Sequence, residues 1–419
     1  MGRIKNHSQK QKGHSGGGPK VKPTKGYVGP SNESTLAGVL KIEEIQAFPL
    51  RIPFKKTARI AFSEYQSCES ILVKMKAGNF VGYGEALTDP AFIGETMESI
   101  LFAIKNYIGP AVLGSDPFAL TEIHHKMDAA LVKNTAAKSA IDIACVDVAG
   151  RAAGEPACNM LGGDLRSSIF EVPEILLGPL HEVVESCQQA VERGVMCLKV
   201  KVGEGYNEDV EKLRRIREAV GNDTEIRLDA NQGWRDYWTA FKIMKRLQRY
   251  DVSLMEQPLP ADDLEGSAKL RKATYVPIML DESIHDVNDV LSAMRLKACD
   301  VISLKVMKVG GLMRTRELVE LCLAHGMPCH LGSSWETEVG WAANLSLIKA
   351  LPGIKLWDAY SPTEIYWGAN ASIGTPIRSL LKDGVRVVEP PEGPGLGVSI
   401  DDKAVAKHLV GESVLLRAS

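Results

Sequence analysis

The sequence contains no Cys-x-x-Cys pair, no long apolar run and no excess of charge of either sign. Its eight cysteines stand singly, most of them among apolar residues, so we expect buried, reduced thiols of a cytoplasmic protein rather than zinc ligands or disulfides. No run approaches the roughly 18 apolar residues that span a bilayer, and no secretory signal pattern precedes the first apolar segment. Fifty Lys and Arg against 52 Asp and Glu leave a net charge of −2, which argues against nucleic acid or membrane as a partner.

Residues 1–37 differ from the rest because they have almost no large apolar side chain. They hold seven Lys and Arg and a single acid, Glu33. Such a segment cannot bury enough surface to offset the entropy lost on ordering, so we expect a disordered basic tail or leader.

Patterns from residue 38 onward predict two kinds of folded structure. Between residues 38 and 165, strand patterns at 42–53, 70–76 and 80–85 precede helical patterns at 95–108, 120–131 and 136–153, which is typical of an α+β domain. From 166 to 380, short apolar strands alternate with amphipathic helices; we expect these strands at 172–177, 197–202, 225–230, 253–256, 278–281, 301–306, 328–331 and 355–357. A strand–helix unit of about 25 residues repeated this way predicts a (β/α) barrel. Residues 381–419 are expected to fold back on the first domain.

Charged and polar residues stand at the carboxyl ends of successive predicted strands. They are Lys199 and Lys201, Asp229 and Asn231, Glu256, Asp281 and Lys305, with neighbouring groups roughly 24 to 28 residues apart. Strand ends of a barrel meet at one mouth, where active sites of this architecture are found. One such residue is commonly part of a strand-end ion pair, but five in phase with the repeat indicate a site.

Three carboxylates and flanking lysines define the expected chemistry of that site. Asp229, Glu256 and Asp281 offer hard oxygen ligands, which suit Mg²⁺, with Mn²⁺ as an alternative. Because successive side chains of a strand point to opposite faces, Lys199 and Lys201 share one face of their strand. Two ammoniums so close to each other and to a cation should have a lowered pKa, which would make a free amine available as a base.

The motifs at these positions resemble the enolase superfamily, specifically its muconate-lactonizing-enzyme subgroup. The matching runs are Lys199-Val200-Lys201, Asp229-Ala230-Asn231, Glu256-Gln257-Pro258, Asp281-Glu282-Ser283 and Lys305-Val306-Met307-Lys308-Val309-Gly310-Gly311. Upstream, Ala140-Ile141-Asp142-Ile143-Ala144 and Leu161-Gly162-Gly163 are similar to the segment before this family's barrel. The resemblance covers about residues 40–400 and includes dipeptide epimerases and N-succinylamino acid racemases.

The resemblance implies both a fold and an assignment of roles. The fold is α/β, a modified (β/α) TIM barrel with an N-terminal α+β capping domain, and the family is commonly homo-oligomeric. Asp229, Glu256 and Asp281 become Mg²⁺ ligands, while Lys201 and Lys305 become acid–base residues on opposite faces of a small-molecule carboxylate. Lys199 becomes an electrostatic neighbour of Lys201. The reaction removes the proton α to a carboxylate through an enediolate, which the metal stabilises.

Substrate-binding residues are expected around the mouth of the barrel. Besides Asn231, the candidates are Tyr65 in a capping loop at 55–65, Trp335 and Glu336 after strand seven, and Trp357 and Asp358 at the end of strand eight. The segment 88–92 is expected to add a second lid contact. His330 lies where another branch of the superfamily has a catalytic His, but its strand-six partner here is Lys305, so a neutral, hydrogen-bonded His330 is favoured.

The end of strand eight departs from the pattern of dipeptide epimerases. They carry an Asp-x-Asp pair there that binds the substrate amine, whereas Leu356-Trp357-Asp358 keeps only the second Asp. Four of six Trp lie in 335–367, with Tyr360 and Tyr366 among them. Together with the tail 393–398, Trp335 is more similar to proline-betaine and hydroxyproline members, and an aromatic wall beside Asp358 would attract a cationic nitrogen. We therefore hypothesise an amino-acid-derived or betaine-like carboxylate as substrate.

Three functions remain open on the sequence alone. The leading hypothesis is an Mg²⁺-dependent racemase or epimerase. The second is a lyase of the same superfamily, either a hydroxyproline-type or acid-sugar-type dehydratase or a cycloisomerase. The third is a catalytically inactive binding barrel, which the complete set of ligands and lysines disfavours.

Overall fold

The computed structural model describes residues 40–361 and 371–418. The predicted tail at 1–37 lies outside the described residues, as do Tyr366 and Trp367 of the expected aromatic cluster. In the part of the chain that is described, no helix is long and apolar enough to cross a membrane.

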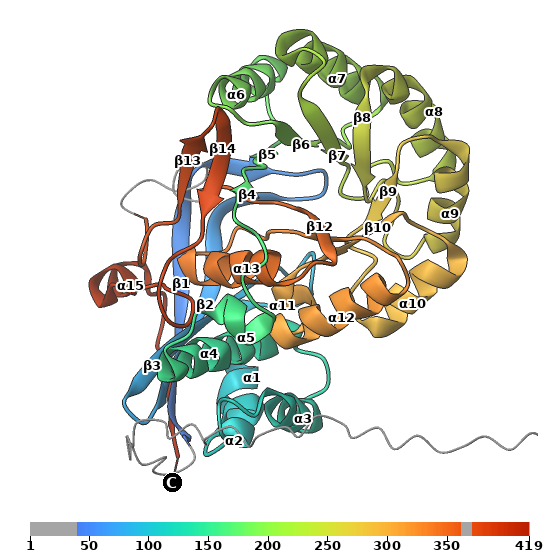
Figure 1. The fold of residues 1–419 in the computed structure, drawn as a ribbon. Coiled ribbons are helices and arrows are strands. Elements are labelled where there is room, and N and C mark those ends of the chain that lie inside the picture. The colour runs from blue at the N-terminus through green and yellow to red at the C-terminus, as the bar shows by residue number, and fades with distance from the viewer. Residues whose placement is uncertain (1–39, 362–370, 419) are drawn as a thin grey trace, which may run out of the picture. The chain divides into compact units, whose positions relative to one another are not determined.

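The chain first forms an antiparallel sheet that contains its last strand as well. Strands β1 (Ile42–Arg59), β2 (Glu64–Ala77) and β3 (Phe80–Leu87) follow one another, and β15 (Val414–Arg417) returns to pair with β1 (Figure 1). The expected loop at 55–65 is mostly strand. Pairing with β2 is interrupted after Pro53 and resumes at Ala58 with Tyr65, so that residues 54–57 form an irregularity in the strand and residues 60–63 form the turn.

Five helical segments and a π-helical turn pack beside this sheet. They are α1 (Met97–Ala103), the π-helical turn η1 (Ile104–Ile108), α2 (Gly109–Val112), α3 (Leu120–Ala130), α4 (Thr135–Ala153) and α5 (Ala157–Leu161). Helix α4 is buried along almost its whole length and lies directly on β3. A β-carbon at Gly82 or Gly84 would overlap the α4 backbone, so these two glycines permit the close approach.

Eight parallel strands form the second part, in sequence order. They are β5 (Glu174–Ile175), β6 (Cys197–Lys201), β7 (Glu225–Asp229), β8 (Val252–Glu256), β9 (Ile278–Leu280), β10 (Val301–Leu304), β11 (Cys329–Leu331) and β12 (Ile354–Trp357). Outside them lie α6 (Leu180–Glu192), α7 (Tyr206–Val220), α8 (Tyr237–Leu247), the 3₁₀ turn η2 (Gln248–Tyr250), α9 (Leu264–Ala273), α10 (Val287–Leu296) and α12 (Leu312–Ala324) (Figure 1). The predicted TIM-barrel architecture is confirmed.

Smaller elements connect the barrel to the first domain. Helix α13 (Glu338–Ala350) packs against α5 and β3, while the short α11 (Val306–Val309) packs against α4. A second small sheet joins β13 (Arg378–Lys382), β14 (Val385–Glu389) and β4 (Ile169–Phe170), and α15 (Asp402–His408) lies on β1. One continuous apolar core runs from the sheet through α4 into β9–β12. The first domain is therefore fused to the barrel by a shared core.

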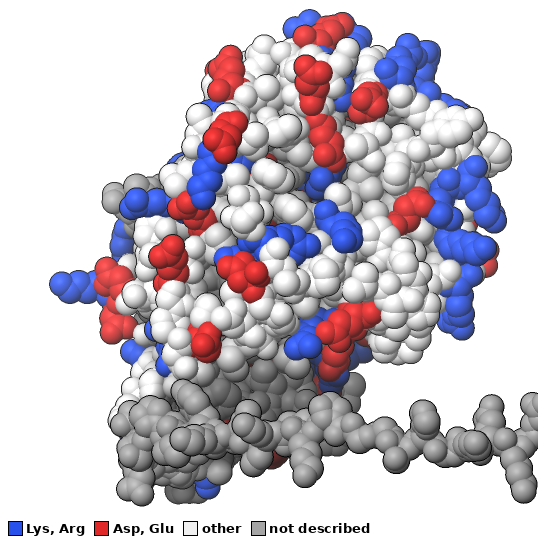
Figure 2. Space-filling model, viewed as in Figure 1, with Lys and Arg blue, Asp and Glu red and all other residues white. Residues whose placement is uncertain are grey.

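The face of the molecule drawn in Figure 2 shows no strong preference for one sign of charge. Acidic and basic side chains are interspersed on the face drawn in Figure 2. All eight cysteines are free and buried, as the sequence predicts.

Glu85 at the end of β3 fastens this domain to the barrel, and its loss should destabilise the fold. Its buried carboxylate accepts hydrogen bonds from Thr337 N (3.0 Å), Thr337 Oγ1 (2.6 Å) and Gly340 N (2.8 Å), at the start of α13. Glu85→Ala would leave these buried donors unpaired, so we expect a loss of about 2 to 4 kcal/mol in the free energy of unfolding by urea. Glu85→Gln should lose less because its amide oxygen still accepts. Glu69→Ala, on the exposed side of β2, should change stability by about 0.5 kcal/mol or less. Equal midpoints for Glu85→Ala and Glu69→Ala would contradict this role.

Candidate active site

Two lysines of β6 lie inside the barrel beside carboxylates of other strands. Strand register pairs Lys201 with Asp229 and Asp229 with Glu256, so all three reach the same level. Lys201 Nζ lies 2.7 Å from Asp229 Oδ2, and Lys199 Nζ lies 2.9 Å from Glu256 Oε2 and 3.0 Å from Asp358 Oδ2. All five side chains are buried. The structure thus brings the predicted lysine pair to two of the predicted metal ligands.

Lys305 approaches the carboxylates from another part of the barrel. It follows β10, which three strands separate from β6. Its Nζ lies 3.0 Å from Asp281 Oδ2 and 4.2 Å from the centre of the Phe92 ring. Lys308 donates to Asp281 Oδ1 at 2.6 Å and so holds the other oxygen of the same carboxylate. Lys201 and Lys305 therefore flank the row of carboxylates from β6 and β10.

The pKa values of these lysines differ from the sequence-based expectation. Burial alone would lower the pKa of Lys199, but the carboxylates of Asp358, Glu256, Glu174 and Asp229 raise it well above its usual value. The pKa of Lys201 is also raised despite burial, chiefly by Asp229 and Glu174, and Asp281 raises that of Lys305. The predicted lowering for the β6 pair is therefore wrong for this structure. Each ammonium is surrounded by carboxylates whose attraction exceeds the repulsion between the two lysines.

Asp229, Glu256 and Asp281 supply donors that fit a hard divalent cation. Glu256 Oε1 accepts no hydrogen bond from any described residue, and Asp281 Oδ2 has only its ion pair with Lys305 at 3.0 Å. Burial and the neighbouring Asp229 raise the pKa of Glu256 well above its usual value, as expected for carboxylates crowded together without compensation. In residues 40–361 and 371–418, no three His, Cys, Asp or Glu side chains are already arranged to hold a metal. Lys199 bridges Asp229 and Glu256, at 3.5 and 2.9 Å, so its ammonium balances part of the charge of these two carboxylates.

A small cavity of about 40 Å³ is lined by Lys201 and by Lys305. The barrel contributes residues from β5, β6, β7, β10 and β11 ends, and the first domain contributes its hairpin and the segment after β3. The lining residues are Ile60, Tyr65, Asp89, Phe92, Glu174, Lys201, Asn231, Lys305, Ser333, Ser334 and Trp335. The expected capping by 55–65 and 88–92 is therefore observed at Ile60, Tyr65, Asp89 and Phe92.

Four predicted substrate-binding residues lie at or beside this cavity. The Tyr65 ring packs edge-to-face on Trp335 with centroids 5.1 Å apart, and its hydroxyl donates to Asp89; burial raises the pKa of Tyr65 to about 12. Asn231 Nδ2 donates to Glu282, while Asn231 Oδ1 accepts no hydrogen bond within the described residues.

Glu336 lies just behind the cavity wall. It accepts hydrogen bonds from Ser333 Oγ (3.1 Å) and Ser334 N (3.0 Å), and burial raises its pKa to about 7. Ser333 and Ser334 line the cavity themselves, so Glu336 supports that wall.

Asp358 is placed differently from the expectation that it binds a cationic nitrogen. Its carboxylate is already engaged by Lys199, by Ser333 N at 3.3 Å and by His330 Nε2 at 3.2 Å. It does not belong to the residues that line the cavity. His330 also contacts Ser303 Oγ at 3.0 Å, and burial lowers the pKa of His330, which fits the neutral His that we predicted.

Trp357 is also absent from the residues that line the cavity. Its indole N–H donates to Phe170 O at 3.0 Å, and Arg166 lies over its ring at 5.5 Å. Trp341 packs edge-to-face on Tyr360 in the core. The predicted aromatic wall therefore reduces to Trp335 on the barrel side, joined by Tyr65 and Phe54 of the hairpin.

Sequence reasoning missed Glu174 at the end of β5. Its buried carboxylate lies 3.3 Å from both Lys199 Nζ and Lys201 Nζ and accepts a hydrogen bond from Trp335 Nε1 at 2.8 Å. Although burial opposes it, the two lysines lower the pKa of Glu174. The sequence did indicate this residue, because Glu174 is the one acid in the apolar strand predicted at 172–177. It lies two residues from the start of that strand, in phase with the charged residues of the other predicted strands.

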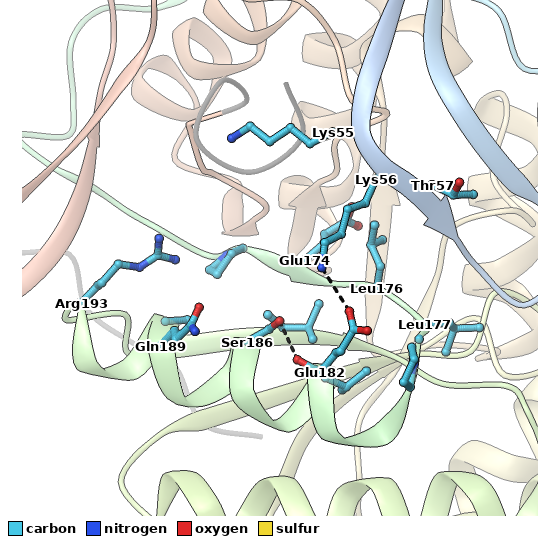
Figure 3. Close-up of a pocket in the computed structure, with 16 residues that line it drawn as sticks. Lys55, Lys56, Thr57, Glu174, Leu176, Leu177, Glu182, Ser186, Gln189 and Arg193 are labelled. Atoms are coloured by element: carbon cyan, nitrogen blue, oxygen red, sulfur yellow. Dashed lines mark hydrogen bonds and ion pairs between the residues drawn. The ribbon is translucent and has the colours of Figure 1, made fainter. Parts of the chain in front are cut away.

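A larger cavity of about 390 Å³ adjoins the site on the other side of Glu174. It lies between β5, helix α6 and the hairpin, from which Lys56 reaches across to Glu182 at 3.1 Å (Figure 3). Its floor is largely apolar, with Ile175 and Leu177 among the lining residues. Glu174 lines both cavities, so the larger cavity borders the small one at this side chain.

A barrel with buried lysines facing acidic strand ends, covered by an α+β domain, is the arrangement of an enzyme active site. Residues 182–404 match the model of the "Enolase C-terminal domain-like" family, and residues 44–162 match that of the "Mandelate racemase / muconate lactonizing enzyme, N-terminal domain". The chain belongs to this family, and to the muconate-lactonizing subgroup of the enolase superfamily.

Its relatives in that subgroup are isomerases. The N-succinyl Arg/Lys racemase of Bacillus cereus has a solved structure with a TM-score of 0.84 and 29% identity, covering 90% of this chain and 100% of that one. The dipeptide epimerase of Enterococcus faecalis, solved with Mg and the dipeptide L-Leu-L-Tyr, has a TM-score of 0.77 and 32% identity, covering 86% and 99%. Muconate cycloisomerase 1 of Rhodococcus opacus is 32% identical over 87% of this chain and 98% of its own length.

Proposed function

We propose that this chain is an Mg²⁺-dependent racemase or epimerase that removes and returns the proton α to the carboxylate of an amino-acid derivative. The single observation that carries this proposal is that Lys201 and Lys305, from strands β6 and β10, line one cavity. Two bases on different sides of one carbon permit proton removal from one face and return to the other. Elimination or ring closure needs only one of them.

The remaining roles follow from the contacts of each side chain. Asp229, Glu256 and Asp281 would hold the cation, which supplies Lewis-acid stabilisation of the negative charge that develops on the substrate carboxylate. Lys199, tied to Asp358 and Glu256, stays away from the cavity wall and acts on the charges around Lys201. Phe92, Tyr65 and Trp335 shield the reacting carbon from water.

The substrate is proposed to extend beyond a single free amino acid. The cavity at the lysines is about 40 Å³, whereas its neighbour beyond Glu174 is about 390 Å³. An acyl or aminoacyl group on the substrate nitrogen would occupy that neighbour, as suits relatives that act on N-succinylamino acids and dipeptides. A betaine-like substrate receives less support, since Asp358 and Trp357 lie away from the cavity.

The cycloisomerase alternative is kept because several relatives are named for that activity. We expect proton NMR in D₂O to show loss of the α-proton signal and appearance of the other stereoisomer with N-succinylamino acids or dipeptides, at a rate dependent on Mg²⁺. Muconate and proline betaine serve as the contrasting arms. Consumption of muconate, with no α-exchange in any amino-acid derivative, would replace the racemase assignment by the cycloisomerase.

A further inference from the structure

Glu174 connects the two β6 lysines to the aromatic cover of the site. It stands on β5 opposite Lys199 in the strand register. One carboxylate oxygen, Oε1, is 3.3 Å from Lys199 Nζ and 3.3 Å from Lys201 Nζ, while the other, Oε2, accepts from the Trp335 indole at 2.8 Å. The side chain is buried, so these charges are weakly screened by solvent.

Trp335 in turn joins Glu174 to the capping hairpin. Its ring packs edge-to-face on Phe54 and Tyr65, with centroids 5.8 and 5.1 Å apart. Its backbone has a φ of +67°, which a tryptophan adopts rarely and only where its surroundings determine the conformation. The contacts around Trp335 therefore hold the indole N–H toward Glu174.

Two carboxylates lie close to Lys201, those of Asp229 and Glu174. Only Glu174 has no other role in the proposed reaction. Asp229, at 2.7 Å, is also a proposed metal ligand, so its charge is shared when a cation is bound. Glu174 is no metal ligand in this scheme. Lys305, by contrast, contacts Asp281 and the face of Phe92, and its electrostatic effect on Glu174 is smaller than that of Lys201 or Lys199.

We infer that Glu174 is a positioning residue that holds Lys201, and not Lys305, in line with the reacting carbon, and that Trp335 transmits closure of the hairpin to it. This inference rests on the proposed racemase or epimerase function. It follows that loss of Glu174 should affect the two enantiomers unequally. The enantiomer whose proton points toward Lys201 should exchange that proton more slowly, because a small displacement of a base from its proton reduces the rate steeply.

The test measures α-proton exchange of each enantiomer separately in D₂O. Lys305→Ala and Lys201→Ala first assign the enantiomers, since each variant should retain exchange only of the form facing the remaining lysine. In Glu174→Gln, which keeps an acceptor for the indole but removes the charge, we expect exchange of the Lys201 enantiomer to fall about 10- to 100-fold and that of the other to change by about threefold or less. Glu174→Asp should restore part of the loss. Trp335→Phe should shift the ratio in the same direction.

Glu225→Gln is the control, because Glu225 is an exposed barrel acid paired with Arg227 at 2.7 Å, at the end of β7 opposite Asp229. It should leave the ratio of the two exchange rates unchanged. Mg²⁺-induced thermal stabilisation should be retained in Glu174→Gln, which shows that the metal ligands are intact. Equal loss for both enantiomers, or no loss for either, overturns the inference. A wild-type protein that exchanges neither enantiomer overturns the proposed function and this inference with it.

Discussion

Lys305→Ala is expected to reduce racemisation by about a thousandfold or more while one enantiomer still exchanges its α-proton with solvent. Lys305 lines the cavity on its β10 side and is the acid–base group proposed there. A positioned acid or base contributes about 10²- to 10⁴-fold. Lys201, across the cavity, keeps its own contacts with Asp229 and Glu174 and so stays in position for proton transfer on its side. Polarimetry follows racemisation, and NMR follows exchange.

Lys305→Arg separates acid–base function from simple charge. It preserves a cation beside Asp281, but a guanidinium does not release its proton near neutral pH, so the loss should equal that of the alanine variant. Lys297→Ala, on the surface at the end of α10, should behave as wild type. If Lys305→Arg retained wild-type racemisation, Lys305 would serve only to balance the charge of Asp281. Loss of exchange in both enantiomers would instead mean that the two lysines do not act on separate faces.

The positions of the reacting groups were accessible from sequence because two local rules determine them. Alternation along β6 places Lys199 and Lys201 on one face, and parallel strands end at one mouth, so Asp229, Glu256 and Lys305 had to approach one another. The same alternation explains Trp357. Its neighbour Asp358 points inward to Lys199, so Trp357 must point to the other face, where it contacts Phe170.

Partners that come from distant parts of the chain were not accessible in this way. Asp358 stands at a strand end as predicted. Only the folded barrel shows that its carboxylate accepts a hydrogen bond from Lys199, 159 positions away. The predicted direction of the lysine pKa shift differed from that in the structure for the same reason. Two neighbouring ammoniums are visible in the sequence, whereas the four carboxylates around Lys199 come from four other strand ends. The length of the hairpin also depends on the pairing of Ala58 with Tyr65 beyond the irregularity, and no local sequence pattern predicts that pairing.

Glu256→Gln is expected to abolish stabilisation of the protein by Mg²⁺. Glu256 occupies the middle of the carboxylate row, since β8 lies between the strands of Asp229 and Asp281. Its Oε1 accepts no hydrogen bond among the described residues, and its pKa is raised by burial and by Asp229, so its charge is the least compensated of the three. A cation that binds the folded state alone stabilises it by about 2.7 kcal/mol at a hundredfold excess over its dissociation constant. Thermal unfolding with increasing Mg²⁺ should therefore show a rising midpoint in wild type and none in Glu256→Gln.

The same experiment distinguishes a metal site at the barrel mouth from general binding of Mg²⁺ to acidic groups. Glu225→Gln removes an equal charge from the far end of β7 and should keep the full Mg²⁺ response. Calorimetric titration should show one site in wild type and in Glu225→Gln, and Mn²⁺ should compete for it because both cations prefer oxygen ligands. Because the Lys199 ammonium lies beside Asp229 and Glu256 and would repel a bound cation, Lys199→Met should bind Mg²⁺ at least as tightly as wild type. Equal stabilisation of wild type and Glu256→Gln would place the metal elsewhere and remove the basis for the proposed carboxylate activation.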